Sequence, residues 1–407
     1  MHIGCGSSSS DDDDVGKRYE KIKNGSWLGQ FGDVCNPWMA RYAYGLLFLL
    51  ANLLAWAVRD YGSSFFKASK RLNECNGGKD CLGTDGVLRV SLGCCMFYLI
   101  MFASTIFIPK VNSWREKWHS GWWIPKIGMM GALLVFPFFL PIKFLSIYGL
   151  ITYFGTGVFL VIQLISINGF INRVSEWCES KDRSCPVMMF ETILHIFFIM
   201  VIIFFYIWFV PRRSCAINIF FITATLILHL LNTAVALFLT KANNVTSSSS
   251  SLTSGFMGLY LLFLCWTALK SEPGEKCILM GGSHTSKIDI VTIASFVLGI
   301  VVIVTATFSV GYHSKRFEFR REHEEHQDAD DVPYNYGFFH FVFAVGTMYF
   351  ALLLNGWNAG HPMRKFTIDV GWVGTWARII NELAAALVYM WLRFSDSKGG
   401  SRGGLTA

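Results

Sequence analysis

The sequence predicts an all-α polytopic membrane protein with about ten transmembrane helices, and two observations carry that prediction. Hydrophobic residues make up 53% of the 407 residues and charged residues only 15%, a balance too apolar for an ordinary soluble domain. The chain also repeats apolar runs of the roughly 20 residues that a helix needs to cross a bilayer core about 30 Å thick.

The apolar runs follow one another along most of the chain. They lie at residues 38–58, 86–108, 121–140, 145–170, 187–210, 216–239, 254–269, 288–311, 336–356 and 371–394. We therefore expect a ten-span domain over residues 36–395, after a disordered tail at 1–35 and before a short tail at 396–407. An even number of spans puts both termini on one side, and the bias of lysine and arginine favours the cytosol.

The fourth run, residues 145–170, is longer than a single crossing requires. Excess apolar length is accommodated by tilting, so this run predicts a helix that lies diagonally in the membrane. Gly149, Gly155 and Gly157 form a strip of small residues along it, on which neighbouring helices can pack closely. We expect a central strut, in which leucine at Gly155 or Gly157 would force the neighbouring helices apart.

Cysteines are placed unevenly between the two sides of the predicted membrane domain. Cys75, Cys81, Cys215 and Cys277 all fall in loops opposite the termini. If that side is oxidising, Cys75–Cys81 and Cys215–Cys277 are candidate disulfides. Cys178 falls on the cytosolic side, where we expect a free thiol.

Several short motifs occur in a fixed order along the spans. They are Arg89-Val90-Ser91, His119-Ser120-Gly121-Trp122-Trp123 with Lys126, Gln163-Leu164, Trp266-Thr267-Ala268 before Glu272-Pro273, Tyr334-Asn335-Tyr336, and Trp376 with Arg378. In these motifs the chain resembles the serine incorporator (Serinc) family, and its start at Asn36-Pro37-Trp38 resembles the plant branch. The resemblance implies two helical bundles arranged around a long diagonal fourth helix.

The resemblance also implies a function. It suggests a membrane factor, not itself an enzyme, that supports the incorporation of serine into phosphatidylserine and sphingolipids. ATP-independent phospholipid scrambling is the alternative attached to the same family. A secondary transporter of a small polar solute such as serine is a further alternative, although no inverted repeat is evident.

The expected partners and location follow from these alternatives. They are membrane phospholipids and sphingolipids, with serine, lipid-biosynthetic enzymes and a second copy of the chain as further candidates. We expect an integral membrane protein of the endoplasmic reticulum and Golgi or of the plasma membrane. The net charge of +7 fits a basic rim against anionic lipid and gives no reason to invoke nucleic acid.

Polar residues inside the spans are the candidates for a functional site, because charge in hydrocarbon costs several kcal/mol without a partner or water. The candidates for a polar seam that handles lipid head groups are Lys126, Arg89, Arg378, Glu382, Gln163, Asn168, Glu191 and His195.

Each candidate has a structural alternative. Lys126 can either snorkel to the interface or hold a lipid phosphate, and Glu191 and His195 could pair with it. Arg378 and Glu382 are spaced i,i+4, which permits an ion pair within one helix as well as a polar path.

The remaining polar residues of the spans are more typical of helix packing than of ligand binding. His229, Asn232 and His340 favour hydrogen bonds between helices.

No catalytic or cofactor motif stands out. The sequence lacks a Walker loop and a nucleophile elbow in a strand–turn–helix context. The run Glu322-His323-Glu324-Glu325-His326 is more typical of a solvated loop than of a metal site. We therefore expect no cofactor, no metal and no catalytic residue.

Overall fold

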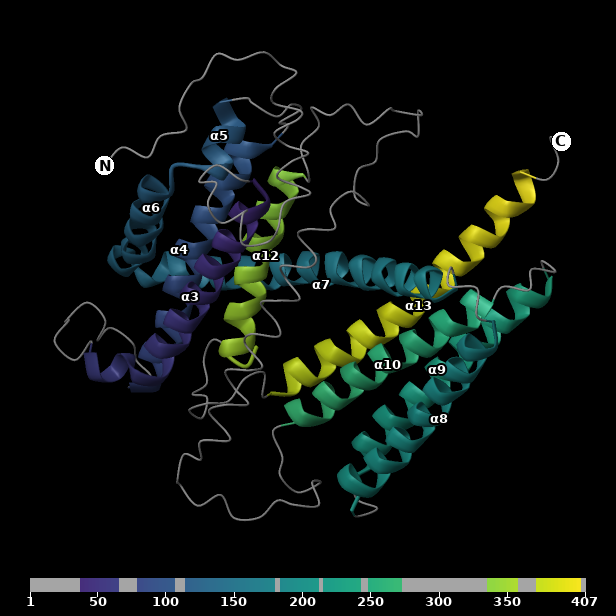
Figure 1. Cartoon of the computed structure of the whole chain (residues 1–407). Coiled ribbons are helices and arrows are strands. Elements are labelled where there is room, and N and C mark those ends of the chain that lie inside the picture. The colour runs from purple at the N-terminus through teal and green to yellow at the C-terminus, as the bar shows by residue number, and fades with distance from the viewer. Residues whose placement is uncertain are drawn as a thin grey trace, which may run out of the picture. The chain divides into compact units, whose positions relative to one another are not determined.

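The computed structural model describes residues 37–65, 79–106, 114–179, 184–211, 215–242, 248–272, 335–357 and 371–403 (Figure 1). All elements in these ranges are helices, which confirms the predicted all-α class. The predicted tail at 1–35 and the predicted eighth span at 288–311 lie outside them.

The helices follow the order of the predicted spans. They are α3 Pro37–Phe65, α4 Lys79–Thr105, α5 Trp114–Ser120, α6 Trp123–Val135, the 3₁₀ turn η3 Phe136–Phe139, α7 Ile142–Glu179, α8 Ser184–Phe209, α9 Ala216–Ala242, α10 Ser248–Ser271, α12 Tyr336–Leu354 and α13 Trp372–Gly403.

By length and hydropathy, seven of the described helices can cross a membrane: α3, α4, α7, α8, α9, α10 and α12. The pair formed by α5 and the segment from α6 through η3 is bent by 68° and makes an eighth if it is taken as one span. Helix α13 lies at the predicted tenth span but is not among the seven, because Arg378, Asn381 and Glu382 lower its hydropathy.

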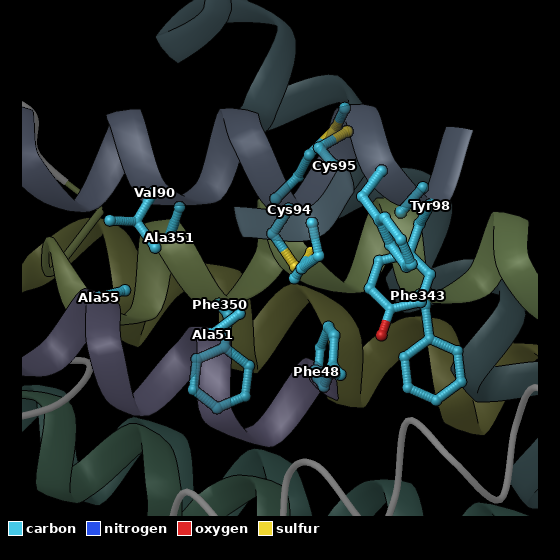
Figure 2. Packing of buried hydrophobic residues seen from close by; sticks show 14 of the residues in the cluster. Phe48, Ala51, Ala55, Val90, Cys94, Cys95, Tyr98, Phe343, Phe350 and Ala351 are labelled. Atoms are coloured by element: carbon cyan, nitrogen blue, oxygen red, sulfur yellow. The ribbon is translucent and has the colours of Figure 1, made fainter. Parts of the chain in front are cut away.

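The chain divides into two compact units. Unit 1 contains α3, α4, α5, α6, η3, the part of α7 up to Phe159, and α12. In its core α4 packs against both α3 and α12. Figure 2 shows Phe48 of α3, Tyr98 of α4 and Phe343 of α12 gathered in this core. The ring centroid of Phe343 lies 4.9 Å from that of Phe48 and 5.2 Å from that of Tyr98, which is the spacing of well-packed aromatic pairs.

Unit 2 contains the rest of α7 from Leu160, together with α8, α9, α10 and α13. Figure 1 shows α8, α9, α10 and α13 side by side, and α10 packs against each of the other three. Phe198, Phe221 and Leu262 fill one part of its core, and Leu261, Ala385 and Ala386 belong to another. Each unit therefore has a hydrophobic core of its own.

Helix α7 is the predicted long fourth helix, with 38 residues, and it contributes to both units. At Gly155 an added Cβ would overlap the Met348 side chain of α12, so the predicted close contact exists there. At Gly157 no described residue lies within 4 Å of an added Cβ, so the close contact predicted there stays a prediction. Among the described residues, the small-residue strip therefore serves close packing at Gly155, where α12 approaches α7.

Among the described glycines, Gly93 of α4 has the closest backbone neighbour on another helix, and that neighbour is in α6. A Cβ at Gly93 of α4 would overlap the carbonyl oxygen of Leu133 in α6. A flexible side chain can turn aside, but a backbone carbonyl moves only with its helix. Gly93 is therefore required where α4 and α6 meet.

We expect Gly93→Ala to lower the free energy of unfolding by about 1–3 kcal/mol, the usual cost of overpacking. Gly157→Ala is the matched control and should be neutral or stabilising by up to about 1 kcal/mol, through its higher helix propensity. Thermal unfolding of the purified protein in detergent micelles measures both. An unchanged unfolding temperature for Gly93→Ala would contradict the close approach of α4 and α6.

Candidate functional site

The chain turns sharply between α5 and α6. Trp122 adopts the left-handed conformation, with φ 57° and ψ 44°, which is uncommon for any residue other than glycine. This bend interrupts the helical hydrogen bonds and leaves carbonyl groups at the end of α5 to be satisfied by other donors. In a membrane protein those donors must come from the protein itself.

Lys126 supplies such donors. Its ammonium donates to the carbonyl oxygen of His119 at 2.9 Å and to that of Gly121 at 2.5 Å. The side chain is fully buried. The ammonium nitrogen also lies 4.6 Å from the ring centroid of Trp123 and 5.3 Å from that of Tyr44, within the range of cation–π attraction.

The snorkelling predicted for Lys126 is therefore wrong, because the ammonium points into unit 1 and the bend gives it acceptors there. A direct role for Lys126 in holding a lipid phosphate stays a prediction. Glu191 and His195 belong to unit 2 and Lys126 to unit 1, so their pairing also stays a prediction.

A buried histidine pair adjoins Lys126. His119 Nδ1 lies 3.1 Å from His340 Nε2 of α12, so His340 makes the helix-to-helix hydrogen bond expected of it. His119 also stacks on Tyr336 with ring centroids 3.9 Å apart. The Tyr44 hydroxyl donates to the carbonyl of His119, the same oxygen that Lys126 binds. These contacts tie α3, α5, α6 and α12 together.

Arg89 plays a similar part at the other end of α6. Its Nη1 group donates to the carbonyl oxygens of Pro137 and of Leu140, the latter at 3.0 Å. Pro137 lies in η3 and Leu140 directly follows it, in a segment where Pro137 and Pro141 have no backbone N–H to donate. Arg89 is 4% exposed, so its charge is held by protein carbonyls.

Helix α7 carries a row of polar side chains along its length. Asn168 is buried and donates from Nδ2 to the carbonyl of Leu164 at 2.9 Å. The side-chain oxygens of Thr156, Gln163 and Ser175 are buried without a hydrogen-bond partner among the described residues. Of these two predicted seam residues, Gln163 shares a helix face with Thr156, seven residues earlier, whereas Asn168 lies on another face together with Ser175.

A second histidine pair lies in unit 2. His195 Nδ1 of α8 is 3.1 Å from His229 Nε2 of α9. His229 is buried and stacks on Phe198 with ring centroids 3.8 Å apart. Glu191 is one turn before His195 on α8 and acts on it electrostatically. Among the described residues no three histidine, cysteine or acidic side chains come together as a metal site would require.

Glu382 of α13 is 2% exposed. Its contacts differ from the ion pair that its i,i+4 spacing from Arg378 suggested. The Thr225 hydroxyl of α9 and the Cys265 thiol of α10 lie beside its carboxyl group. Oε1 of Glu382 has no hydrogen-bond partner in the described part of the chain. In place of the predicted ion pair with Arg378, polar groups from neighbouring helices lie beside Glu382. The other predicted arginine, Arg89, belongs to unit 1, whereas Arg378 belongs to unit 2.

At the end of α10 a carboxyl group lies just beyond the span. Burial raises the pKa of Glu272 above its ordinary value, while a hydrogen bond with the Asn218 side chain opposes that shift. Asn218 is itself buried on α9 and donates to the carbonyl of Phe209 at 3.0 Å. Glu272 thus extends the polar interior of unit 2 toward the end of α10.

The cysteines are only partly within the described residues. Cys215 is disulfide-bonded, and its partner is not among the cysteines whose side chains are described. Cys75, Cys277 and the side chain of Cys81 lie outside that part, so both predicted pairings stay predictions. Cys178 is a free cysteine, as expected.

The sequence did not single out Tyr44, Thr225 or Cys265, which complete the surroundings of Lys126 and Glu382. For Thr225 a signal existed, since Thr225, His229 and Asn232 are spaced i, i+4 and i+7 and so share one helix face. For Tyr44 no local signal exists, because its contact with Lys126 joins residues far apart in the chain.

Together the fold and these contacts define an integral α-helical membrane protein with charged side chains buried in each of its two helical units. The family model described as serine incorporator (Serinc) matches residues 26–328 and 311–394. The chain belongs to the serine incorporator family, which confirms the resemblance seen in its motifs. Its similarity to the plant branch stays a prediction, as do the compartment and the orientation of the termini.

Three relatives illustrate the match. A probable serine incorporator of Dictyostelium discoideum is 27% identical over 346 residues, which cover 78% of this chain and 81% of the relative. A probable serine incorporator of Monosiga brevicollis is 21% identical over 433 residues, which cover 88% of this chain and 89% of the relative. Serine incorporator 2 of Mus musculus is 21% identical over 356 residues, which cover 77% of this chain and 78% of the relative. Similarity thus extends over most of each chain.

We expect Lys126→Met to destabilise the protein by about 1–3 kcal/mol, because the Gly121 carbonyl loses its buried donor while the His119 carbonyl keeps only the Tyr44 hydroxyl. Lys143→Met, at an exposed position near the start of α7, is the control and should be near neutral. Thermal unfolding in detergent micelles measures both variants. Wild-type stability of Lys126→Met would show that the ammonium does not hold the bend.

Proposed function

We propose that this protein is a multi-pass membrane factor, not itself an enzyme, that supports the incorporation of serine into phosphatidylserine and sphingolipids. The observation that carries the proposal is membership of the serine incorporator family, together with relatives that carry that name over most of their length. Serine, the membrane lipids and the enzymes that join them are its proposed partners.

The contacts of the charged residues are consistent with the proposed role of a factor that is not itself an enzyme. Lys126 and Arg89 use their donors on backbone carbonyls at two helix breaks, so both charges stabilise the fold of unit 1. Outward-facing positions of α8 are instead apolar, for example Ile193, Ile196 and Met200. Such a molecule presents a lipid-compatible surface and a stable interior, which suits a factor that organises lipid synthesis at the membrane.

A second candidate function is ATP-independent phospholipid scrambling, and the polar row on α7 favours it. Thr156, Gln163 and Ser175 keep unpartnered oxygens along a helix whose candidate span covers 34 residues. A head group that crosses a bilayer needs hydrogen-bonding groups along its path, while the acyl tails can stay in lipid. Under this alternative the row on α7 is that path.

We expect cells that make the protein to incorporate more labelled serine into phosphatidylserine and sphingolipids than matched cells that lack it. Labelled acetate is the control for total lipid synthesis and should give the same incorporation in both. Gly93→Ala, which weakens the fold without touching the polar residues, should reduce the gain in proportion to the folded protein that remains. Equal serine incorporation with and without the protein would contradict the proposed role.

If the scrambling alternative holds, purified protein in liposomes should expose inner-leaflet fluorescent phospholipid to an external quencher without ATP. Thr156→Val and Gln163→Leu should each slow exchange by about fivefold, equivalent to the roughly 1 kcal/mol of one lost hydrogen bond. Gly157→Ala, on the same helix with no described residue within 4 Å of the added Cβ, should exchange at the wild-type rate. No exchange above that of protein-free liposomes rejects scrambling and leaves the serine proposal standing.

A further inference from the structure

Leu140 and Pro141 form a break between η3 and α7, and a buried guanidinium lies at this break. Arg89 of α4 donates from Nη1 to the carbonyl oxygens of Pro137 and Leu140, the latter at 3.0 Å. Both bonds of the side chain to described residues start from Nη1, and Nε is buried without a hydrogen-bond partner among them. The edge formed by Nε and Nη2 is the fork with which arginine binds carboxylate or phosphate through two parallel hydrogen bonds. That edge is left for another acceptor.

The two carbonyl groups satisfy N–H groups of Arg89 but do not balance its charge. Arg89 is almost fully buried, and buried charges are normally paired with an opposite charge. Asp85, one turn earlier on α4, acts on Arg89 electrostatically but accepts no hydrogen bond from Nε. Lys143 brings a second positive charge three residues after Leu140. The formal charges of these three side chains therefore leave one positive charge over.

The start of α7 adds hydrogen-bond donors beside this charge. Ile142 and Lys143 open a helix of 38 residues, and the N–H groups of a first turn have no acceptor within their own helix. The N–H of Phe144 donates to the carbonyl of Pro141 at 3.1 Å, whereas those of Ile142 and Lys143 find no backbone acceptor in the described part of the chain. The positive end of the helix dipole lies here as well, and together these features favour an anion.

The surroundings of the break suit a lipid better than a soluble anion. Phe139 and Phe144, one before and one after Lys143 in the chain, are 66% and 59% exposed. Large exposed apolar side chains beside polar groups are typical of a surface that contacts a membrane. A phospholipid supplies both a phosphate for the donors and acyl chains for the phenylalanines, whereas inorganic phosphate supplies only the first.

We propose that the break between η3 and α7 binds the phosphate group of a membrane phospholipid. The Nε and Nη2 edge of Arg89, the N–H groups of Ile142 and Lys143 and the Lys143 ammonium hold the phosphate oxygens. The acyl chains lie against Phe139 and Phe144. The phosphodiester carries one negative charge, which balances the positive charge left over at the break.

Phospholipid binding at this break does not depend on serine incorporation or on scrambling, because a lipid can be held without being made or moved. A measurement of bound lipid can therefore fail while the serine proposal stands, and the reverse is also true.

Native mass spectrometry of the full-length protein, released from detergent micelles, tests the proposal by counting bound lipid. Dioleoyl phosphatidylglycerol, whose phosphate carries its only charge, is titrated into the micelles, and we expect the wild type to retain it. Dioleoylglycerol has the same acyl chains without the phosphate and should bind far more weakly. Inorganic phosphate at millimolar concentration should not displace the phospholipid.

Substitutions then locate the bound lipid. Lys143→Met should weaken binding about tenfold, the effect of losing one charge-assisted hydrogen bond. Arg89→Lys keeps the positive charge but loses the forked edge, and should weaken binding at least as much. Lys241→Met, at an exposed position in the last turn of α9, is the matched control and should bind like the wild type. Since Lys143 is exposed, its variant covers the case in which Arg89→Lys does not fold.

Four results would overturn the proposal. The first is a wild type that retains no phospholipid. The second is equal binding by the wild type, Lys143→Met and folded Arg89→Lys, since the lipid would then lie elsewhere. The third is equal binding of dioleoylglycerol, because the acyl chains alone would then be recognised. The fourth is displacement by inorganic phosphate, which would assign the break to a soluble anion.

Discussion

The whole structure depends on the rule that a polar group in hydrocarbon must find its partner within the protein. Where α5 gives way to α6, the bend at Trp122 frees carbonyl groups, and Lys126 binds two of them. Where η3 gives way to α7, Arg89 binds two more. Positive charge is thus used where helices break, because ammonium and guanidinium groups carry several donors and helix ends offer several acceptors.

The same rule is met by direct contacts at some sites and not at others. In unit 1 Lys126 binds backbone carbonyls and His119 pairs with His340, while Arg89 Nε and His340 Nδ1 have no hydrogen-bond partner among the described residues. In unit 2 buried polar atoms of His229, Asn232 and Glu382 have no partner among the described residues. Buried donors and acceptors without a protein partner are normally satisfied by ordered water.

The fold class and the long fourth helix were predictable because both depend on hydropathy summed over many residues. The direction of single side chains was not. The i,i+4 spacing of Arg378 and Glu382 allows an ion pair on one helix, but it cannot tell that Thr225 and Cys265 stand beside Glu382. Gly155 and Gly157 look alike in the sequence, yet only Gly155 faces Met348. The Lys126 side chain points inward because of the 68° bend between α5 and α6, and the hydropathy of the sequence does not indicate that bend.

The order of the helices has a consequence for how the protein is made. Helix α12 belongs to unit 1 but follows all of α8, α9 and α10 of unit 2 in the chain, and 89% of its span is buried. During synthesis, the face of α4 that receives α12 therefore stays open in the membrane until nearly the whole chain has left the ribosome. Until α12 arrives, Ser91 lacks the carbonyl of Thr347 and has the Tyr148 hydroxyl of α7 as its partner.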